Sequence, residues 1–242
     1  MLLDIGNSRS KWALVQAGEW LAEGVSAHDE ADRLLQEWDR FAPPSEVIVS
    51  CVAGRERLET FSAYWQSRNV PCRRMEAAGS CAGVRNLYER PAQLGIDRWA
   101  ALIGAWARAR SACLVVSAGT AVTVDALNGR GEFVGGMILP GKRLMQRSLA
   151  TGTHALEDTK GLASDFPRNT ADAIATGVAT ALACAAQGGF QRLAGTGGKP
   201  PQCIITGGDA EWLAGHLQFG AIIAPRLVLE GLLIMSSEDA KQ

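Results

Sequence analysis

The 242-residue sequence has few of the residues and spacings that hold metals or form disulfides. Its three histidines lie far apart, with no HExxH pattern or Cys/His cluster around them, which argues against a zinc site. Its six cysteines are scattered without CxxC spacing, as in proteins kept reduced. These residues are His28, His154, His216, Cys51, Cys72, Cys81, Cys113, Cys184 and Cys203. We therefore expect a cytoplasmic protein.

Excess charge of one sign and long apolar runs are also missing. The 24 basic and 25 acidic residues leave a net charge of -1, which argues against nucleic acid or an anionic membrane surface as partner. No uninterrupted apolar run reaches the roughly 18 residues of a membrane span, and the N-terminus enters a polar loop instead of a signal-peptide core. The composition favours a globular protein that acts on a small substrate.

The widespread nucleotide and hydrolase loops are absent as well. The sequence contains no GxxxxGK[ST], GxGxxG or GxSxG pattern, and "GTGGKP" at Gly195 to Pro200 fits a surface turn. A phosphate-binding role would therefore need another kind of loop.

Strand-like and helix-like patterns alternate along the chain, which predicts a mixed α/β fold. Residues 113–141 are typical of a meander of strands, in which Gly135 and Gly136 act as turn residues or line a cleft. Trp12, Trp99 and Trp106 are expected in the core or at a subunit contact. Residues 1–15 are predicted as strand, loop and strand, and residues 47–52 as a further strand. The predicted helices are residues 31–40, 99–110, 170 to about 184, and 227–235.

The two halves of the chain resemble each other. "LLDIGNSRSKWALV" aligns with "LVVSAGTAVTVDAL", so that Asp4 falls on Ser117, an offset of 113 residues. Strand, glycine turn and strand follow in the same order in both. Chance matches of short glycine turns are an open alternative. The repeat suggests two related domains, residues 1–110 and 111–242, with the last helix packing back on the first domain.

The opening turn has two interpretations. In the functional one, Gly6 admits phosphate to the backbone, Asn7 and Ser8 donate hydrogen bonds, Lys11 adds charge, and Asp4 reaches phosphate through Mg²⁺. In the structural one, the segment is a plain β-hairpin with a solvated lysine.

A second candidate site is "RNLYERPAQLGIDRWAAL". Asp97 beside Arg98 at a helix start is expected to stay ionised and could accept a hydroxyl proton, whereas the alternative is an N-cap. Thr170 likewise is either an N-cap or a hydroxyl aimed at substrate. The loop Thr206 to Trp212, "TGGDAEW", is a candidate for the nucleoside or a mere turn.

Five segments in this order resemble the type III pantothenate kinases of the acetate and sugar kinase, heat-shock and actin superfamily. They are "DIGNSRSKW", "NLYERPAQLGIDRW", "AGTAVTVD", "GGMILPG" and "NTADAIATG", of which the stretch from Tyr88 to Arg98 is the most diagnostic. The resemblance implies two ribonuclease H-like domains, a homodimer, and transfer of the ATP γ-phosphoryl group to pantothenate.

The resemblance also implies roles for individual residues. Asp97 is the expected base, and the residues matching pantothenate-binding positions are Tyr88, Gly95, Ile96, Asp97, Arg98 and Thr170. The residues matching ATP-phosphate positions are Asp4, Ile5, Gly6, Asn7, Ser8, Arg9, Ser10, Lys11 and Thr120. Asp4 is expected to hold Mg²⁺ through water.

The chain departs from the family at Ser117, where an Asp usually holds an activating K⁺ or NH₄⁺. A serine contributes no charge, so we expect reduced K⁺ dependence. The alternatives are a weakly active homologue that serves as a regulatory or accessory binding protein, and a kinase for a sugar or short acid. Retention of Asp4, Lys11, Asp97 and Arg98 argues against the regulator.

Overall fold

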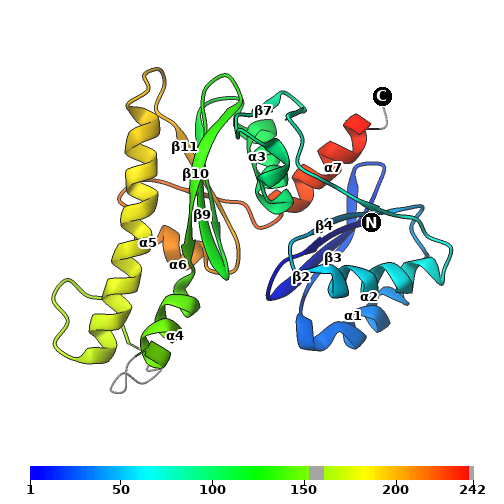
Figure 1. Ribbon diagram of the computed structural model, residues 1–242, viewed down its shortest axis with the longest axis horizontal. Coiled ribbons are helices and arrows are strands. Elements are labelled where there is room, and N and C mark those ends of the chain that lie inside the picture. Colours follow the sequence, from blue (N-terminus) through cyan, green and yellow to red (C-terminus); the bar gives the residue numbers. More distant parts are fainter. Residues whose placement is uncertain (153–160, 240–242) are drawn as a thin grey trace. The chain divides into compact units, whose positions relative to one another are not determined.

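The computed structural model describes residues 1–152 and 161–239 (Figure 1). His154 lies outside the described residues. By its internal contacts the chain divides into two compact units, one comprising Met1–Arg108 with Arg226–Gln242 and the other Ala109–Pro225. The first unit therefore takes back the C-terminal helix.

The first unit contains a five-stranded mixed sheet in the order β3-β2-β1-β4-β5. Neighbours are antiparallel for β1–β2 and β2–β3 and parallel for β1–β4 and β4–β5. All five residues of β4 are buried, as expected for an apolar strand covered on both faces. The strands are β1 (Leu2–Ile5), β2 (Arg9–Gln16), β3 (Glu19–Ala27), β4 (Val47–Cys51) and β5 (Cys72–Arg74).

Aromatic side chains from the sheet and two helices form the core of this unit. Trp12 packs edge-on against Trp38, which also contacts Phe61 and Trp65. Trp12 and Trp99 are fully buried and Trp106 nearly so, which agrees with the core prediction. The helical segments are η1 (His28–Glu30), α1 (Ala31–Trp38), α2 (Arg55–Gln66), η2 (Pro91–Gln93), α3 (Ile96–Ala109) and α7 (Leu227–Asp239), and β6 (Ser80–Cys81) pairs with β7 (Val84–Asn86).

Helices α3 and α7 meet at two glycines. A Cβ on Gly104 would collide with the Leu227 backbone, and one on Gly231 would collide with the Ala100 backbone. Arg108 forms an ion pair with Glu230 across the same two helices. The close approach anchors α7 within the first unit.

The second unit repeats the strand arrangement of the first. Its strands lie in the order β12-β11-β8-β9-β10, with β8–β9 and β9–β10 antiparallel and β11–β8 and β11–β12 parallel. When the strands of each unit are numbered from its first strand, the strand order and the strand directions are the same in both units. The predicted duplication is therefore present in the fold. The elements are β8 (Cys113–Ala118), β9 (Ala121–Leu127), β10 (Glu132–Pro140), β11 (Gln202–Thr206), β12 (Ile222–Ile223), α4 (Lys142–Gly152), α5 (Thr170–Ala194) and α6 (Ala210–Ala214).

Helix α5 is the core helix of this unit. Its buried residues Val178, Leu182 and Ala186 pack in one cluster with Leu114 and Val124 of the sheet. It is long and apolar enough to cross a membrane by length and composition. Packing against the sheet instead identifies it as a core helix of a soluble protein, and it runs ten residues past Cys184, where the sequence pattern predicted its end.

Two local predictions were wrong in the second unit. Gly135 and Gly136 lie inside β10 and not in a turn, where they pair with Ala126 and Asp125 of β9. A β-bulge shifts the register between Phe133 and Gly135, and Gly135 has φ +132° beside it. The N-cap of α5 is Asn169, whose side chain accepts a hydrogen bond from the Asp172 amide, so Thr170 is the first helical residue.

Candidate active site

The first candidate group surrounds the turn after β1. The Gly6 amide donates to the Arg9 carbonyl at 3.1 Å, which closes the turn between β1 and β2. The strand register places Lys11, Asp4 and Ser50 side by side on β2, β1 and β4. Side chains opposite each other on neighbouring strands point to the same face. The three residues therefore form a polar row across the sheet.

Ser50 is the residue of this row that sequence reasoning missed. Its hydroxyl is fully buried and donates a 2.9 Å hydrogen bond to Oδ1 of Asp4. Its signal in the sequence is weak, because one polar residue within an apolar strand can simply satisfy the backbone. The two partners are 46 positions apart in the sequence, and only the fold brings them together.

Burial dominates the electrostatics of Asp4. Burial, followed by the nearby charge of Asp97, raises the pKa of the Asp4 carboxyl to about 6, although the Ser50 hydrogen bond and the Lys11 charge act in the opposite direction. The ionised carboxylate is thus held in an unfavourable environment. A cation bound beside it would relieve this cost.

The second candidate group lies at the start of α3. The Asn86 side chain shapes the preceding loop by donating to the Pro91 carbonyl at 3.2 Å and accepting from the Tyr88 amide at 3.1 Å. A Cβ on Gly95 would lie 2.7 Å from Oδ1 of Asp97, so a glycine leaves room for that carboxylate. The loop therefore fixes where Asp97 begins the helix.

Asp97 and Arg98 occupy the first turn of α3, which begins at Ile96, so Asp97 is not the N-cap residue. Oδ1 of Asp97 accepts a 2.8 Å hydrogen bond from the Arg98 amide. Burial raises the Asp97 pKa, outweighing the Arg98 amide and charge that lower it. The guanidinium of buried Arg98 donates to the Tyr88 hydroxyl at 3.3 Å. Sequence reasoning had predicted a carboxylate held ionised by Arg98 and the helix dipole, whereas burial is the stronger influence.

The third candidate group surrounds the turn after β8 in the second unit. The Gly119 amide donates to Ala121 O, and the Gly141 amide at the start of α4 donates to the Thr120 carbonyl at 2.9 Å. Gly207, with φ +105°, lies against the backbone of Ala118. A side chain at Gly141 or Gly207 would collide with this turn. Glycine at both positions lets three backbone segments meet.

A second polar row crosses the sheet at this turn. Thr123, Ser117 and Thr206 are paired on β9, β8 and β11, as Lys11, Asp4 and Ser50 are on the strands of the first unit. The hydroxyls of Thr123 and Thr206 are buried and have no hydrogen-bond partner among the described residues. The equivalent of the charged row is thus built from hydroxyls alone.

Thr170 lies apart from the second polar row. It lines an apolar cavity of about 530 Å³ between α4 and α5, whose lining includes Met145, Leu149 and Ile174 but neither Ser117 nor Thr120. Thr170 itself is exposed. Within its own unit it therefore has no part in the turn that contains Thr120.

The described part of the chain contains no group of three His, Cys, Asp or Glu side chains that could hold a metal ion. Asp4 is the buried carboxylate beside the first turn, so protein atoms alone make a poor Mg²⁺ site. Mg²⁺ bound here would take most of its oxygen ligands from water and phosphate, as it commonly does.

The fold defines the class of the protein. The fold of this chain matches that of a 2-dehydro-3-deoxygalactonokinase-like protein from Sinorhizobium meliloti over 97% of both chains, with a TM-score of 0.63 at 17% identity. It matches the activator of the 2-hydroxyisocaproyl-CoA dehydratase from Clostridium difficile, solved with ADPNP, with a TM-score of 0.55 at 12% identity over 99% of this chain and 95% of that one. These neighbours place the chain in the fold class of sugar kinases and actin-like ATPases.

Sequence comparison narrows the class to one family. The model of the type III pantothenate kinase family matches residues 1–192. A type III pantothenate kinase of Nitrosospira multiformis is 42% identical over all of this chain and 92% of its own length, and one of Thiobacillus denitrificans is 45% identical over 96% and 94%. The chain belongs to the type III pantothenate kinase family.

Proposed function

We propose that this enzyme transfers the γ-phosphoryl group of ATP to the hydroxyl of pantothenate, giving 4'-phosphopantothenate, the first step of coenzyme A synthesis. The observation that carries the proposal is a carboxylate pair of the first unit, in which half-buried Asp97 at the start of α3 acts electrostatically on buried Asp4 beside a glycine turn. Family membership supplies the substrate.

Asp97 is the proposed base. Phosphoryl transfer asks the protein mainly to position the reactants and to stabilise charge, and a carboxylate receives the one proton released by the hydroxyl. The raised pKa of Asp97 makes it a better proton acceptor than an exposed Asp. The proton passes from the pantothenate hydroxyl to Asp97 as the oxygen attacks the γ-phosphorus atom and ADP leaves.

The neighbours of Asp97 are the proposed pantothenate contacts. Arg98 and Tyr88 are held together by their hydrogen bond, and Arg98 carries a buried positive charge suited to the substrate's carboxylate or to transferred phosphate. Gly95 and Ile96 supply backbone at the same point. Thr170 of the second unit is a further proposed pantothenate contact, because it matches a pantothenate-binding position of the family.

The glycine turns are the proposed ATP-phosphate sites. Residues Asp4 to Lys11 comprise the first turn and the strand ends that it joins, and Thr120 belongs to the second turn. Mg²⁺ neutralises phosphate charge when bound, and Asp4 would hold it through water. Beside the second turn, Lys142 lies 4.5 Å from the ring centre of Trp212, which makes the Thr206 to Trp212 loop our candidate for the nucleoside.

Ser117 does not fit an activating K⁺ or NH₄⁺. The residues of its row, Thr123 and Thr206, are neutral, so the row offers a cation no compensating charge. The proposed transfer therefore uses no monovalent cation at this row.

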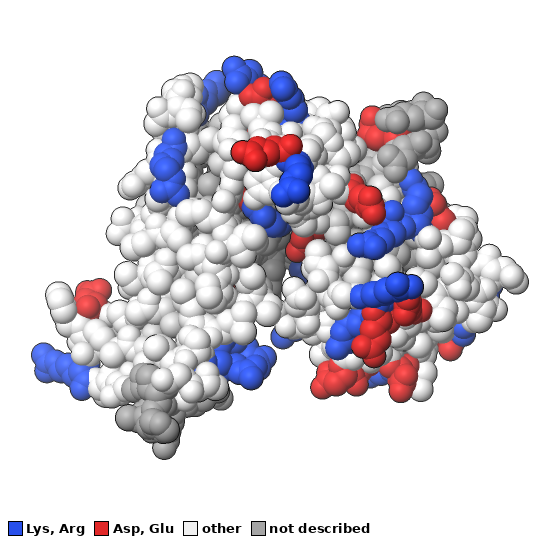
Figure 2. All heavy atoms as spheres, in the orientation of Figure 1, with Lys and Arg blue, Asp and Glu red and all other residues white. Residues whose placement is uncertain are grey.

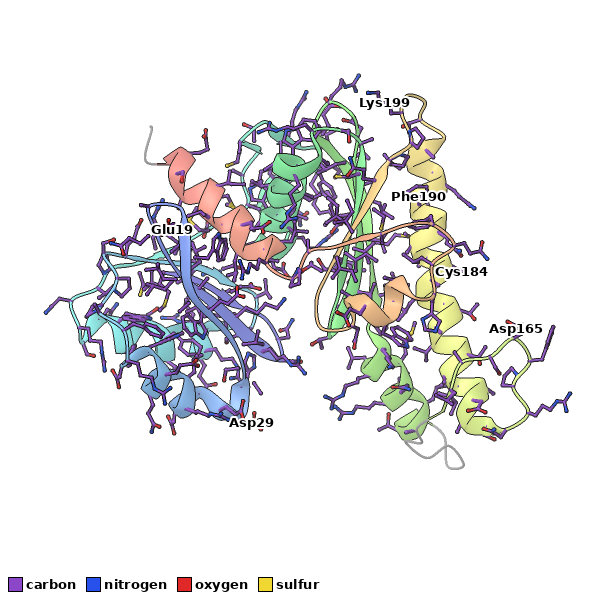
Figure 3. The ribbon with its side chains drawn as sticks, turned by 180° about the vertical axis from the view of Figure 1, so that it is seen from behind. Glu19, Asp29, Asp165, Cys184, Phe190 and Lys199 are labelled. Atoms are coloured by element: carbon purple, nitrogen blue, oxygen red, sulfur yellow. The ribbon has the colours of Figure 1, made fainter. Side chains whose placement is uncertain are left out.

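We also propose that the enzyme is a cytoplasmic homodimer. The exposed side of α5 contains small, uncharged residues at helical spacing, and Leu162 and Phe166 nearby are 81% and 90% exposed. The surface over the middle of α5 has no charged side chains in Figure 2, and Figure 3 shows Cys184 at this level of the helix. Such a face is suited to a second copy. The residues are Ala173, Gly177, Ala181 and Cys184, of which the first three also line the open cavity between α4 and α5.

The test is ADP release from Mg·ATP with and without pantothenate. Native enzyme should show pantothenate-dependent release, and Asp97→Asn should lose at least about 10²-fold in kcat while still binding nucleotide, since a positioned base contributes about that much or more. Asp165→Asn, at an exposed Asp, is the matched control. Native protein without pantothenate-dependent release would refute the kinase and favour the regulatory homologue, whereas release with a sugar or short acid would favour another kinase.

A further inference from the structure

The two polar rows occupy equivalent positions of the duplicated fold but differ in charge. In the first unit a carboxylate, Asp4, stands at the centre of the row, with Lys11 on one side and Ser50 on the other. In the second unit the central residue is Ser117, and Thr123 and Thr206 flank it. Both central residues lie on the strand that leads into a glycine turn. The fold thus presents either a carboxylate or a hydroxyl to the same kind of turn.

The flanking hydroxyls are unusual for buried polar groups. Thr206 is 2% exposed and Thr123 8% exposed, yet neither hydroxyl has a hydrogen-bond partner within the described ranges. Buried hydroxyls without partners cost free energy, so they are rarely kept without a use. Both side chains point to the face that Ser117 shares. Ser117 itself is only half-buried and therefore accessible from the turn.

A hydroxyl and a carboxylate meet phosphate differently. A carboxylate repels phosphate oxygens and approaches them only through a cation, whereas a hydroxyl donates a hydrogen bond directly. Neither threonine hydroxyl bonds Ser117 within the described residues, so both are available to donate to the serine oxygen when Ser117 donates its own proton to a bound phosphate. The row can therefore orient the Ser117 hydroxyl toward an oxygen at the Gly119–Thr120 turn.

We propose that Ser117 binds a phosphate oxygen of the nucleotide directly, with Thr123 and Thr206 as positioning residues, so that no monovalent cation is needed there. The inference rests on the proposed kinase function and goes beyond it by assigning Ser117 a contact of its own. It makes the second phosphate turn of this enzyme a neutral donor site, in contrast to the charged first turn.

The first experiment measures nucleotide binding without turnover. Titration calorimetry of native protein, Ser117→Ala and Thr206→Val with Mg·ADP and with Mg·AMP-PNP is done in K⁺ buffer and in choline buffer. Native affinity should be equal in both buffers, and Ser117→Ala should weaken it about tenfold in both, as expected for one lost hydrogen bond. Thr206→Val should weaken it less, and Ser67→Ala, at an exposed serine of the first unit, should leave it unchanged.

The second experiment restores the carboxylate. Ser117→Asp should bind Mg·AMP-PNP poorly in choline and should recover at least in part as K⁺ is added. A native affinity that rises steeply with K⁺, or a Ser117→Ala affinity equal to native, would overturn the inference. The calorimetry does not need pantothenate. If the nucleotides bind with the expected salt dependence but no pantothenate-dependent turnover occurs, the kinase function is refuted and the role of Ser117 is not. Native protein that binds neither nucleotide would refute both.

Discussion

Replacing Asp4 by Asn is expected to stabilise the free protein at neutral pH while removing its kinase activity. Burial and the charge of Asp97 raise the Asp4 pKa from 3.8 to about 6, so ionising this group is harder in the folded protein than in the unfolded chain. That difference corresponds to ~3 kcal/mol at neutral pH. The free protein therefore carries a cost that the bound metal and nucleotide offset.

The pH dependence follows from the sign of this change. A carboxyl whose pKa is raised by folding contributes stability below its unfolded value of 3.8, and this contribution is lost as the pH rises through about 6. The stability of Asp4→Asn relative to native protein should therefore be lowest near pH 4, should rise between pH 4 and about 6, and should reach its full advantage above pH 7.

The net gain is smaller than the ionisation cost. The asparagine can still accept the Ser50 hydrogen bond, but its buried amide hydrogens need acceptors, which costs about 1 kcal/mol or more. A net gain of roughly 1–2 kcal/mol should raise Tm by about 3–6 °C in a protein of this size. Thermal unfolding in metal-free buffer from pH 5 to pH 8 measures it, with Asp165→Asn as control.

Two outcomes would refute this reasoning. One is a variant that is less stable than native protein throughout the pH range, and the other is a difference in Tm that does not change with pH. Mg·AMP-PNP should then raise the Tm of native protein more than that of Asp4→Asn, because only the native carboxylate offers a negative charge to the metal.

Three further substitutions test other parts of the structure. Ser50→Ala should raise the Mg²⁺ concentration for half-maximal activity about tenfold, because it removes a buried hydrogen bond of Asp4. Ser50→Thr should restore part of the lost Mg²⁺ affinity. Equal Mg²⁺ curves for native protein and Ser50→Ala would contradict the role of Ser50 in positioning Asp4. Gly207→Ala, at φ +105° against Ala118, should lower Tm and raise the KM for ATP more than that for pantothenate, and an unchanged KM for ATP would separate this loop from the phosphate turn. Ala181→Glu should convert the dimer to a monomer, as measured by light scattering, whereas the control Glu211→Lys should remain a dimer. A native protein that is monomeric would refute the α5 interface.

Local features of the chain could be predicted from sequence because they depend on near neighbours. The strand that contains Asp4, the glycine turn after it, and the helix containing Trp99 follow from side-chain periodicity and turn residues. The repeat was visible because, in each half of the chain, strand, turn and strand follow one another within a short segment. The family could be predicted because five short segments, in their order and spacing along the sequence, resemble those of the family.

Contacts between distant segments could not be predicted in this way. Ser50 reaches Asp4 only because β4 crosses over to lie parallel to β1, and Gly207 meets Ala118 only because β11 does the same beside β8. The extent of α5 beyond Cys184 likewise depends on the sheet that buries its apolar face. Propensity and periodicity contain no information about which strands become neighbours.

The charge state of the site was also decided by tertiary structure. In the sequence, the Asp-Arg pair at residues 97 and 98 predicts a low pKa for the carboxyl, since only the adjacent guanidinium and the helix start are visible. In the fold, burial removes water from Asp97 and Asp4 and raises both pKa values. The sequence by itself determined which carboxylates, hydroxyls and glycines are available and on which strands and turns they lie. The tertiary structure decided which of them face each other and how much water remains around them, because desolvation depends on everything packed around a group.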